Sequence, residues 1–563
     1  MKTRTVRLGM GETPGATRIT RRDFLKIGGT GLAGAALLGT AGCGVFEQGG
    51  EQGGGGGGNS ISLNLQDAIR DLDSTTTTDS ISYGILLNVM EGLYFLDENE
   101  EPQPGQAESV EISDDKLTYA FTLRDGITWS NGDPVTSQDF KYAWLRALDP
   151  ETAGQYAYIL STFIEGAAEY NEGKGSAEDV AVEAPDDKTL EVRLVAPSPF
   201  WLGLTAFHTY LPQNQRFVEE QGEQYAQSAD ALLYNGPYVL TEVNPSEGAT
   251  MVKNDDYWDA ENVDIQRVEG SIVKELATAV NLHESGELDV TEISQEYVTE
   301  YRDSEDFYSM TTLAVFYMVP NENTVPLFRN ENIRKALQMS FQKQALTNDI
   351  LKDGSEPADG YVPEGIAGPE GETFREAQGP VSPEYDPEEA RRLFQQGIEE
   401  EGGENPTIEL LAYDTASGRD IATFLQSQLQ DNLGAKIDVL VQPFDRKLEL
   451  DENGEFQLSW QGWIADYNDP MTFLDLWETD SPFNTGGYSN ERYDDLIARA
   501  REETDDAKRM DLLLEAERIL IKDDAACAPM FYEGIAWLVE PSIENFTYYR
   551  IGGDAIRFWR LQS

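Results

Sequence analysis

The chain has little positive charge and little histidine, and both shortages exclude functions. Its 563 residues include 42 Lys and Arg against 102 Asp and Glu, a formal net charge of −60. We expect no nucleic-acid partner, because such binders need basic surface to displace condensed counterions. The two histidines, His208 and His283, stand in no zinc or nucleophile motif. We therefore expect no metal, no cofactor and no catalytic residue, and the chain is not interpreted as an enzyme.

The chain nevertheless has the material for a large folded body. Hydrophobic residues make up 40% and aromatic residues 10%, which is unlike a disordered acidic chain. Residues 117–124 and 189–195 alternate apolar and polar side chains between turn sequences, the pattern of half-buried strands. Strands and helices alternate without a repeat over about 500 residues, so the composition and pattern predict an α/β protein of several lobes.

Capping residues mark the expected helices. Thr136 or Ser137 precedes an amphipathic segment, residues 138–148. Asp386 stands before a proline and two glutamates, which predicts a helix start. A third helix is expected to begin at Ser489, and residues 505–522 are predicted to form a long amphipathic helix.

The first 42 residues are interpreted as an export signal and excluded from the fold. Arg21 and Arg22 precede a short Gly- and Ala-rich apolar stretch, which resembles a twin-arginine signal. Small residues then lead to Cys43, which resembles a lipoprotein cleavage site, and a Gly-rich tether follows to residue 60. We expect a lipid at Cys43 to hold the protein on the outer face of the cell membrane. The alternative is an unprocessed N-terminal anchor in which Cys43 is incidental.

The basic residues of the N-terminal signal make the whole chain less acidic than its body. The signal contains seven basic and two acidic residues, so the remaining body is more acidic than the whole chain. Such a surface suits a salt-rich medium, where screening suppresses self-repulsion, and a halophilic source is one hypothesis. A merely acidic secreted protein is the other. Cys527 is the one further cysteine, and we expect it to be buried core and not a reactive thiol.

Several segments, read in order, point to one family. These are ISDDKLTYAFTLRDGITWSNGDPVTSQDF (112–140), LLYNGPYVLTE (232–242), KNDDYWDAENV (253–263), NLHESGELDVTEI (281–293), FRNENIRKALQMSF (328–341) and GWIADYNDPMTFLDLW (462–477). Their order and spacing resemble the extracytoplasmic solute-binding proteins of oligopeptide and dipeptide ABC importers, solute-binding protein family 5.

The resemblance implies a fold and its division. It implies a periplasmic-binding-protein-like α/β fold with mixed sheets, in which two lobes enclose the ligand and a third lobe is added. Lobe I would be discontinuous, comprising residues 61–90, 216–318 and 533–563. Lobe II would comprise residues 91–215 and lobe III residues 319–532.

The resemblance also places a ligand site. Family members that bind free peptides hold the N-terminal ammonium with an aspartate in the GWIADY motif, and this position falls on Asp466. A partly buried carboxylate is a natural partner for that compact cation. Trp463 matches a position whose ring lines the pocket. The alternative for Asp466 is a carboxylate that caps the loop before Asn468.

Three tyrosines complete the expected site, and two departures limit it. Tyr156 and Tyr158 match a segment that reaches toward ligand from lobe II, although ordinary packing would also explain them. Tyr317 falls where the chain should cross from lobe I to lobe III. Trp460 stands where some relatives carry an arginine near the ligand, and residues 75–78 are threonines where some relatives supply an acid.

The implied function is recognition without chemistry. An extended peptide would be captured between lobes by hinge closure, with tolerant, hydrated side-chain pockets, and delivered to a membrane permease and its ATPase. We expect a monomer. The alternative is the same fold with a non-peptide solute, such as chelated nickel or a sugar.

Overall fold

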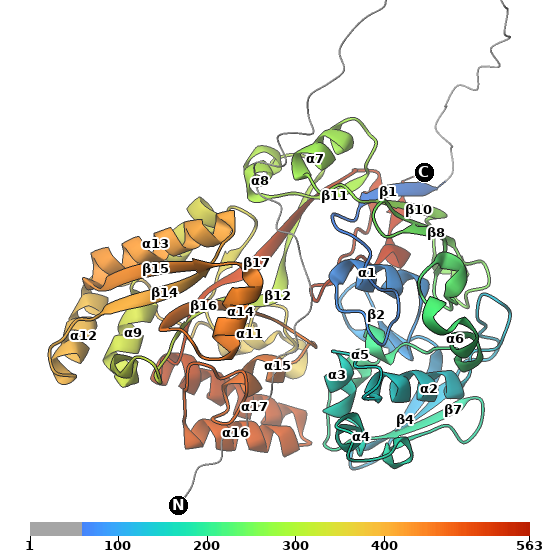
Figure 1. The fold of residues 1–563 in the computed structure, drawn as a ribbon, viewed down its shortest axis with the longest axis horizontal. Coiled ribbons are helices and arrows are strands. Elements are labelled where there is room, and N and C mark those ends of the chain that lie inside the picture. The colour runs from blue at the N-terminus through green and yellow to red at the C-terminus, as the bar shows by residue number, and fades with distance from the viewer. Residues whose placement is uncertain (1–58, 563) are drawn as a thin grey trace, which may run out of the picture. The chain divides into compact units, whose positions relative to one another are not determined.

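The structure is a computed structural model that describes residues 59–562 (Figure 1). The predictions on Arg21, Arg22 and Cys43 lie outside the described residues. All described residues belong to one compact unit, residues 58–563. The first strand begins at Ser60, the residue with which the tether was expected to end. No helix in the described part of the chain is both long enough and apolar enough to cross a membrane.

One large mixed sheet runs through this unit. Its strand order is β15-β14-β16-β12-β17-β11-β1-β10-β9-β8, and β13 also pairs with β17. The bounds are β1 Ser60–Asn64, β8 Tyr238–Asn244, β9 Gly248–Lys253, β10 Arg267–Ser271, β11 Val290–Glu292, β12 Phe307–Pro320, β13 Glu356–Pro357, β14 Thr407–Tyr413, β15 Lys436–Gln442, β16 Leu458–Ile464 and β17 Ala528–Val539. Parallel pairs (β14 with β15 and β16, β1 with β10 and β11) combine with antiparallel ones. The fold class is therefore α/β with a mixed sheet, as predicted.

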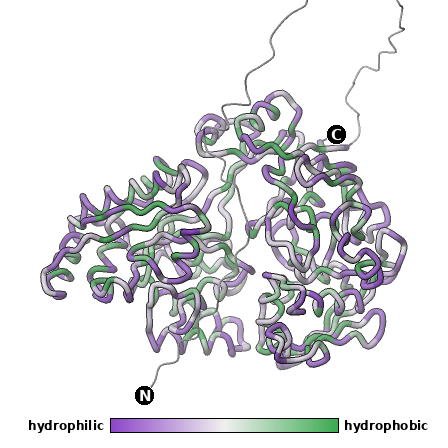
Figure 2. Tube along the Cα trace, in the orientation of Figure 1, coloured by the Kyte–Doolittle hydropathy of each residue, from purple (hydrophilic) through white to green (hydrophobic). Residues whose placement is uncertain are grey.

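The two longest strands, β12 and β17, pair antiparallel with each other in the middle of this sheet. Residues 312–320 of β12 and most of β17 are buried almost without alternation, as expected for strands covered on both faces, whereas residues 307–311 of β12 are partly exposed. Figure 2 shows that hydrophobic runs follow these strands, whereas hydrophilic residues recur along the helices around them. Strand β17 also pairs with β11, so a segment near the chain's end is joined to segments from its first 300 residues.

Smaller sheets lie in the rest of the unit. Strands β4 (Ala107–Ile112), β5 (Thr118–Leu123), β7 (Thr189–Arg193) and β6 (Val182–Glu183) form an antiparallel sheet in that order. β2 (Tyr94–Leu96) pairs with β3 (Pro102–Pro104), and β18 (Ile543–Glu544) with β19 (Arg560–Leu561). Strands β5 and β7 confirm the two strands predicted from alternation.

Helices connect and cover the strands. Their bounds are α1 Ser80–Val89, α2 Ser137–Leu148, α3 Ala157–Ser161, α4 Ala167–Asn171, α5 Trp201–Leu204, α6 Gln215–Gln221, α7 Leu276–Glu284, α8 Gln295–Tyr301, α9 Glu331–Met339, α10 Lys343–Ala345, α11 Phe374–Gln378, α12 Pro387–Glu400, α13 Ala416–Leu433, α14 Phe444–Glu452, α15 Met471–Leu474, α16 Glu491–Glu502 and α17 Asp506–Glu517.

The capping predictions hold with one correction. Thr136 and Asp139 form a capping box at α2, and the Asp386 carboxylate accepts the N–H of Glu389 at α12. The helix expected from Ser489 begins later, because the Asn490 side chain accepts the first free N–H groups of α16. The helix predicted over residues 505–522 is regular to residue 517 and continues as a π-helical turn, residues 518–523.

The cores divide along the sequence. One hydrophobic cluster joins residues 61–268 with Val290, Trp537 and the C-terminal Trp559. Two others draw only on residues 313–532. Cys527 is 1% exposed inside one of them, which confirms the prediction of a buried thiol. The exact lobe boundaries stay a prediction.

Candidate ligand-binding site

Asp466 stands where a strand gives way to a loop. Strand β16 pairs antiparallel with β12, with Trp463 opposite Val315, and the chain leaves it at Ala465. The backbone N–H of Asp466 donates to the Thr472 hydroxyl at 3.2 Å. The carboxylate that accepts a backbone N–H in this loop is that of Asp469, which takes Met471 N–H at 2.9 Å. Asp469 thus caps a backbone N–H of this loop, and the Asp466 side chain accepts no backbone N–H among the described residues.

The Asp466 carboxylate meets one side chain from a distant segment. The hydroxyl of Tyr158 donates to Asp466 Oδ1 at 3.0 Å. Among residues 59–562, no Lys or Arg lies within ion-pair distance of this carboxylate, whereas the neighbouring Asp469 is paired with Arg509 at 2.7 Å. Burial raises the pKa of Asp466 to about 6, against the hydrogen bonds from Tyr158 and Thr472 that lower it. The group is thus a partly buried acid without a cation.

Aromatic contacts join the Asp466 loop to residues 156–207. The Tyr467 ring stacks on Phe200, with centroids 4.1 Å apart and planes 6° apart. Phe163 meets the same tyrosine edge-on at 6.0 Å. Tyr156 and Tyr158 stack at 5.9 Å. Rings in such offset and edge-on contacts attract each other beyond the area they bury, so these contacts hold the loop against this part of the chain.

A cavity of about 290 Å³ opens beside Asp466. Rings from four stretches of sequence line it, at Tyr83, Phe95, Phe207 and Tyr549 among others, together with Met90 and Met510. Glu91 and Arg557 also reach its wall, but they are 2.9 Å apart and buried, so their charges compensate. The Arg557 guanidinium lies 3.9 Å from the centre of the Phe95 ring. The cavity is therefore mainly apolar, and Asp466 shares its wall with Glu100 and Glu101, which likewise form no ion pair among the described residues.

A loop forms one wall of the cavity, and a buried ion pair stabilises this loop. This cavity loop (residues 358–373) brings Ala367 and Gly368 to the cavity, and Ala367 N–H donates to Asn468 Oδ1 at 2.8 Å. Glu517, fully buried on α17, accepts the N–H groups of Tyr361 and Val362 at 2.8 and 2.9 Å.

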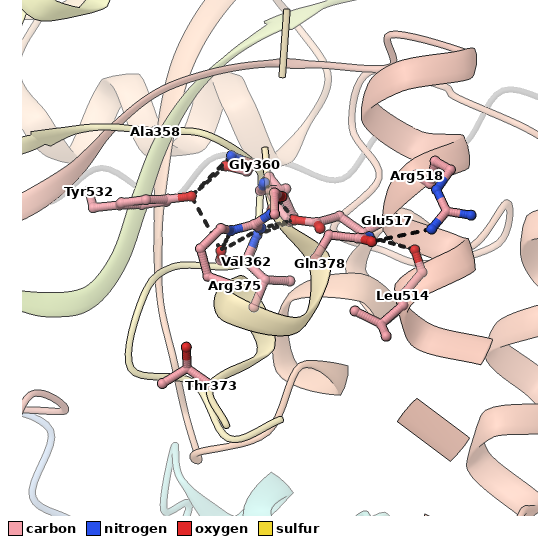
Figure 3. Close-up of polar contacts among 12 residues, drawn as sticks. Ala358, Gly360, Val362, Thr373, Arg375, Gln378, Leu514, Glu517, Arg518 and Tyr532 are labelled. Atoms are coloured by element: carbon pink, nitrogen blue, oxygen red, sulfur yellow. Dashed lines mark hydrogen bonds and ion pairs between the residues drawn. The ribbon is translucent and has the colours of Figure 1, made fainter. Parts of the chain in front are cut away.

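Figure 3 shows how this support continues. Arg375 forms an ion pair with Glu517 and donates to the Val362 carbonyl at 2.8 Å. The Tyr532 hydroxyl accepts the Gly360 N–H at 3.0 Å. The start of the cavity loop is thus fixed by side chains from α11, α17 and β17.

The structure brings some of the predicted site residues together and leaves others apart. Tyr158 meets Asp466, and Tyr156 packs beside Tyr158. Trp463 is half-buried on β16 with its ring 5.1 Å from Phe483, and it does not line the cavity. Tyr317 is 5% exposed and packs between Tyr361 and Trp477, away from the cavity wall. Whether any of them contacts ligand stays a prediction.

Sequence reasoning missed most of the cavity wall. Phe200 follows two prolines in a turn, Tyr83 lies on α1 and Tyr549 in the last segment, and no local pattern connects them. Each alone is indistinguishable from a core aromatic residue. Phe200 carried the one usable signal, because an aromatic side chain in a proline-flanked loop is half-exposed more often than one within a strand.

Comparisons with known proteins agree with this architecture. The chain matches the family described as bacterial extracellular solute-binding proteins, family 5 Middle, over residues 101–485. It is 33% identical to the dipeptide-binding protein DppE of Bacillus subtilis over 94% of this chain and 97% of that protein. It is 32% identical to the oligopeptide-binding protein OppA of the same organism, over 86% and 90% of the two chains.

A solved structure extends the likeness to three dimensions. Listeria monocytogenes OppA bound to peptide superposes with a TM-score of 0.72 at 35% identity, covering 90% of this chain and all of that one. Family, sequence and fold agree over nearly the whole described unit. The chain belongs to the bacterial extracellular solute-binding proteins of family 5.

Proposed function

We propose that the protein captures peptides with a free N-terminus beside Asp466 and delivers them to the permease of an ABC importer. Asp466 carries the proposal, because a partly buried carboxylate without a cation is stabilised when a ligand supplies one. Support comes from relatives named for dipeptide and oligopeptide binding and from the OppA structure described as bound to peptide.

Binding is proposed to proceed without any chemical reaction of the ligand. An extended peptide would place its ammonium on Asp466 and its backbone along the segment that follows β16, adding main-chain hydrogen bonds that do not depend on sequence. Closure of the lobes around β12 and β17 would then commit the ligand and present a surface to the permease and its ATPase.

Calorimetry with matched peptides tests the ammonium assignment. The purified protein is titrated with a tripeptide and with its N-acetylated form, and the titrations are repeated for Asp466→Ala. We expect the wild type to bind the free peptide at least about tenfold more tightly, and the variant to bind the two forms equally. Asp480→Ala removes an exposed carboxylate on the same stretch and serves as the matched control.

Two results would refute the proposal. One is an equal loss of affinity for both peptides in Asp466→Ala. The other is native mass spectrometry that finds a non-peptide solute co-purified with the wild-type protein while no peptide binds.

We further propose that Cys43 is lipidated after export through the paired arginines. Metabolic labelling with palmitate tests the anchor: the label should be incorporated in the wild type and in Cys527→Ser, and lost in Cys43→Ser. Cys527 is the suitable control because it is buried in the core. Label retained in Cys43→Ser would contradict the anchor. Replacing Arg21 and Arg22 with lysine should leave the precursor inside the cell, and export unaffected by that change would contradict the signal assignment.

A further inference from the structure

We propose that the aromatic cavity beside Asp466 receives the first side chain of the bound peptide and makes the protein selective for peptides that begin with a large aromatic or aliphatic residue. The inference rests on the proposed function and adds a substrate class to it. It also departs from the sequence-based expectation of tolerant, hydrated side-chain pockets.

Asp466 links the binding of the peptide ammonium to the placement of the first side chain. In any peptide the N-terminal ammonium and the first side chain are attached to the same Cα atom. A ligand whose ammonium pairs with Asp466 must therefore direct its first side chain into space next to this carboxylate. The cavity is that space, because Asp466 and the adjoining Tyr467 both form part of its wall.

The size of the cavity suits a ring. An apolar protein cavity of about 150 Å³ is enough to bind benzene. The cavity here is about 290 Å³, so an indole or phenol side chain fits with room for its methylene group. A glycine or alanine side chain would leave most of the cavity unfilled, and the contacts that its lining could make would be lost.

The chemistry of the wall favours an apolar occupant over a charged one. Rings at Tyr83, Phe95, Phe207 and Tyr549 offer faces and edges for stacking. The Arg557 guanidinium is paired with Glu91, which also accepts the Trp258 indole N–H at 2.7 Å, so neither member of this pair offers a free charge to a ligand side chain. An acidic side chain would lie near Asp466 without compensation. A charged side chain of either sign would lose its hydration in this aromatic cavity, and the acidic groups on the wall, among them Glu100, would add repulsion for Asp and Glu, while aromatic side chains are stabilised.

A substitution at Gly203 can test the role of the cavity directly. Gly203 lies on α5, lines the cavity, and a Cβ built on it meets no atom within 4 Å. Its backbone conformation is one that other residues adopt, because no left-handed φ is found there. A larger side chain at this position can therefore fill the cavity without displacing backbone. Gly203→Leu is the blocking variant, and Gly203→Ala, which adds one methyl group to the same helix, is its matched control.

The experiment measures a peptide series by calorimetry. The probes are tripeptides X-Ala-Ala with free N-termini, in which X is Trp, Phe, Leu, Ala, Lys or Glu. For the wild type we expect Trp- and Phe-first peptides to bind about ten- to a hundredfold more tightly than the Ala-first peptide, from burial of the ring. In Gly203→Leu this advantage should fall below about threefold while the Ala-first peptide keeps its affinity, since the filled volume is one it does not use. Gly203→Ala should keep most of the preference.

The outcomes separate this inference from the function beneath it. Equal affinity for all X, or tighter binding of Lys- or Glu-first peptides, overturns the selectivity and leaves peptide binding intact. A preference that survives unchanged in Gly203→Leu overturns the assignment to this cavity. If no peptide of the series binds the wild type, the proposed function fails and this inference with it. The wild-type series needs no variant, so the selectivity is decided even if Gly203→Leu folds poorly.

Discussion

Tyr158 and Asp466 lie 308 positions apart in the sequence, and the hydroxyl of the tyrosine donates to the carboxylate at 3.0 Å. The tyrosine side chain is 44% exposed, so it contacts the acid from the solvent side and not from within a core. This hydrogen bond and the Thr472 hydroxyl are the contacts that favour the ionised form, while burial opposes it. The ionisation of Asp466 therefore depends on burial, which opposes it, and on two hydrogen bonds, which favour it. Changes in pH or in these hydrogen-bond partners should shift it.

Peptide affinity should depend on pH with a midpoint near the pKa of Asp466. Burial raises that pKa to about 6, and the like charge that interacts with it is Asp475, whose own pKa burial raises to about 7. A peptide ammonium pairs with the ionised form only. We expect Kd to be lowest between about pH 6 and pH 8, to rise about tenfold per unit below pH 6 as Asp466 is protonated, and to rise again above about pH 8 as the α-amino group of the peptide loses its proton. Calorimetry across pH 5–9 measures this, with the N-acetylated peptide as the control. A free-amine peptide with a flat profile would contradict the prediction.

Tyr158→Phe should move that midpoint upward. The variant keeps the ring but removes the hydroxyl whose hydrogen bond lowers the pKa of Asp466. Affinity for a free-amine peptide should consequently fall at pH 6 and change little at pH 8. Tyr156→Phe is the matched control, because it loses a hydroxyl on a stacked neighbour that makes no hydrogen bond to Asp466 within residues 59–562. The same midpoint in wild type and Tyr158→Phe would show that the hydrogen bond does not tune the acid.

Asp466→Asn should stabilise the unliganded protein at alkaline pH. The pKa of Asp466 rises on folding from an ordinary 3.8 to about 6, so its stabilising contribution is complete below pH 4 and is lost as the pH passes 6. Asparagine does not ionise and avoids that loss, which amounts to about 2–3 kcal/mol for a shift of this size. Urea unfolding should show the variant to be more stable than wild type at pH 8 but not at pH 4. Asp480→Asn, at an exposed site, should show no such pH dependence, and a variant less stable than wild type at pH 8 would refute the argument.

The sequence predicted what short-range chemistry determines. The capping box at Thr136 and the cap at Asp386 located α2 and α12, because a cap and the N–H groups it accepts are within three residues. Alternation of apolar and polar residues is also a local pattern, and it located β5 and β7. The family resemblance brought Asp466 and Tyr158 to attention, but their mutual contact depends on how distant segments pack. The cavity wall was missed because its rings come from segments hundreds of residues apart.

A buried ion pair supports the cavity from outside it. Arg375 and Glu517 are 5% and 0% exposed, and Glu517 Oε1 also accepts two backbone N–H groups at the start of the cavity loop. Its second oxygen, Oε2, is buried and makes no hydrogen bond within the described residues. Removing either partner leaves a charge in a site that water cannot reach.

Arg375→Met should therefore destabilise the protein by about 3–5 kcal/mol in urea unfolding, because the Glu517 carboxylate is left buried without its cation. The double variant Arg375→Met, Glu517→Gln should recover part of that loss, since the neutral amide oxygen can still accept the N–H groups of Tyr361 and Val362. The exposed pair Arg392 and Glu389 is the matched control, and its disruption should change stability little. If the single variant also weakens peptide binding at temperatures where it is fully folded, the ion pair positions the cavity loop as well as stabilising it. A single variant as stable as wild type would contradict the predicted contribution of the pair to stability.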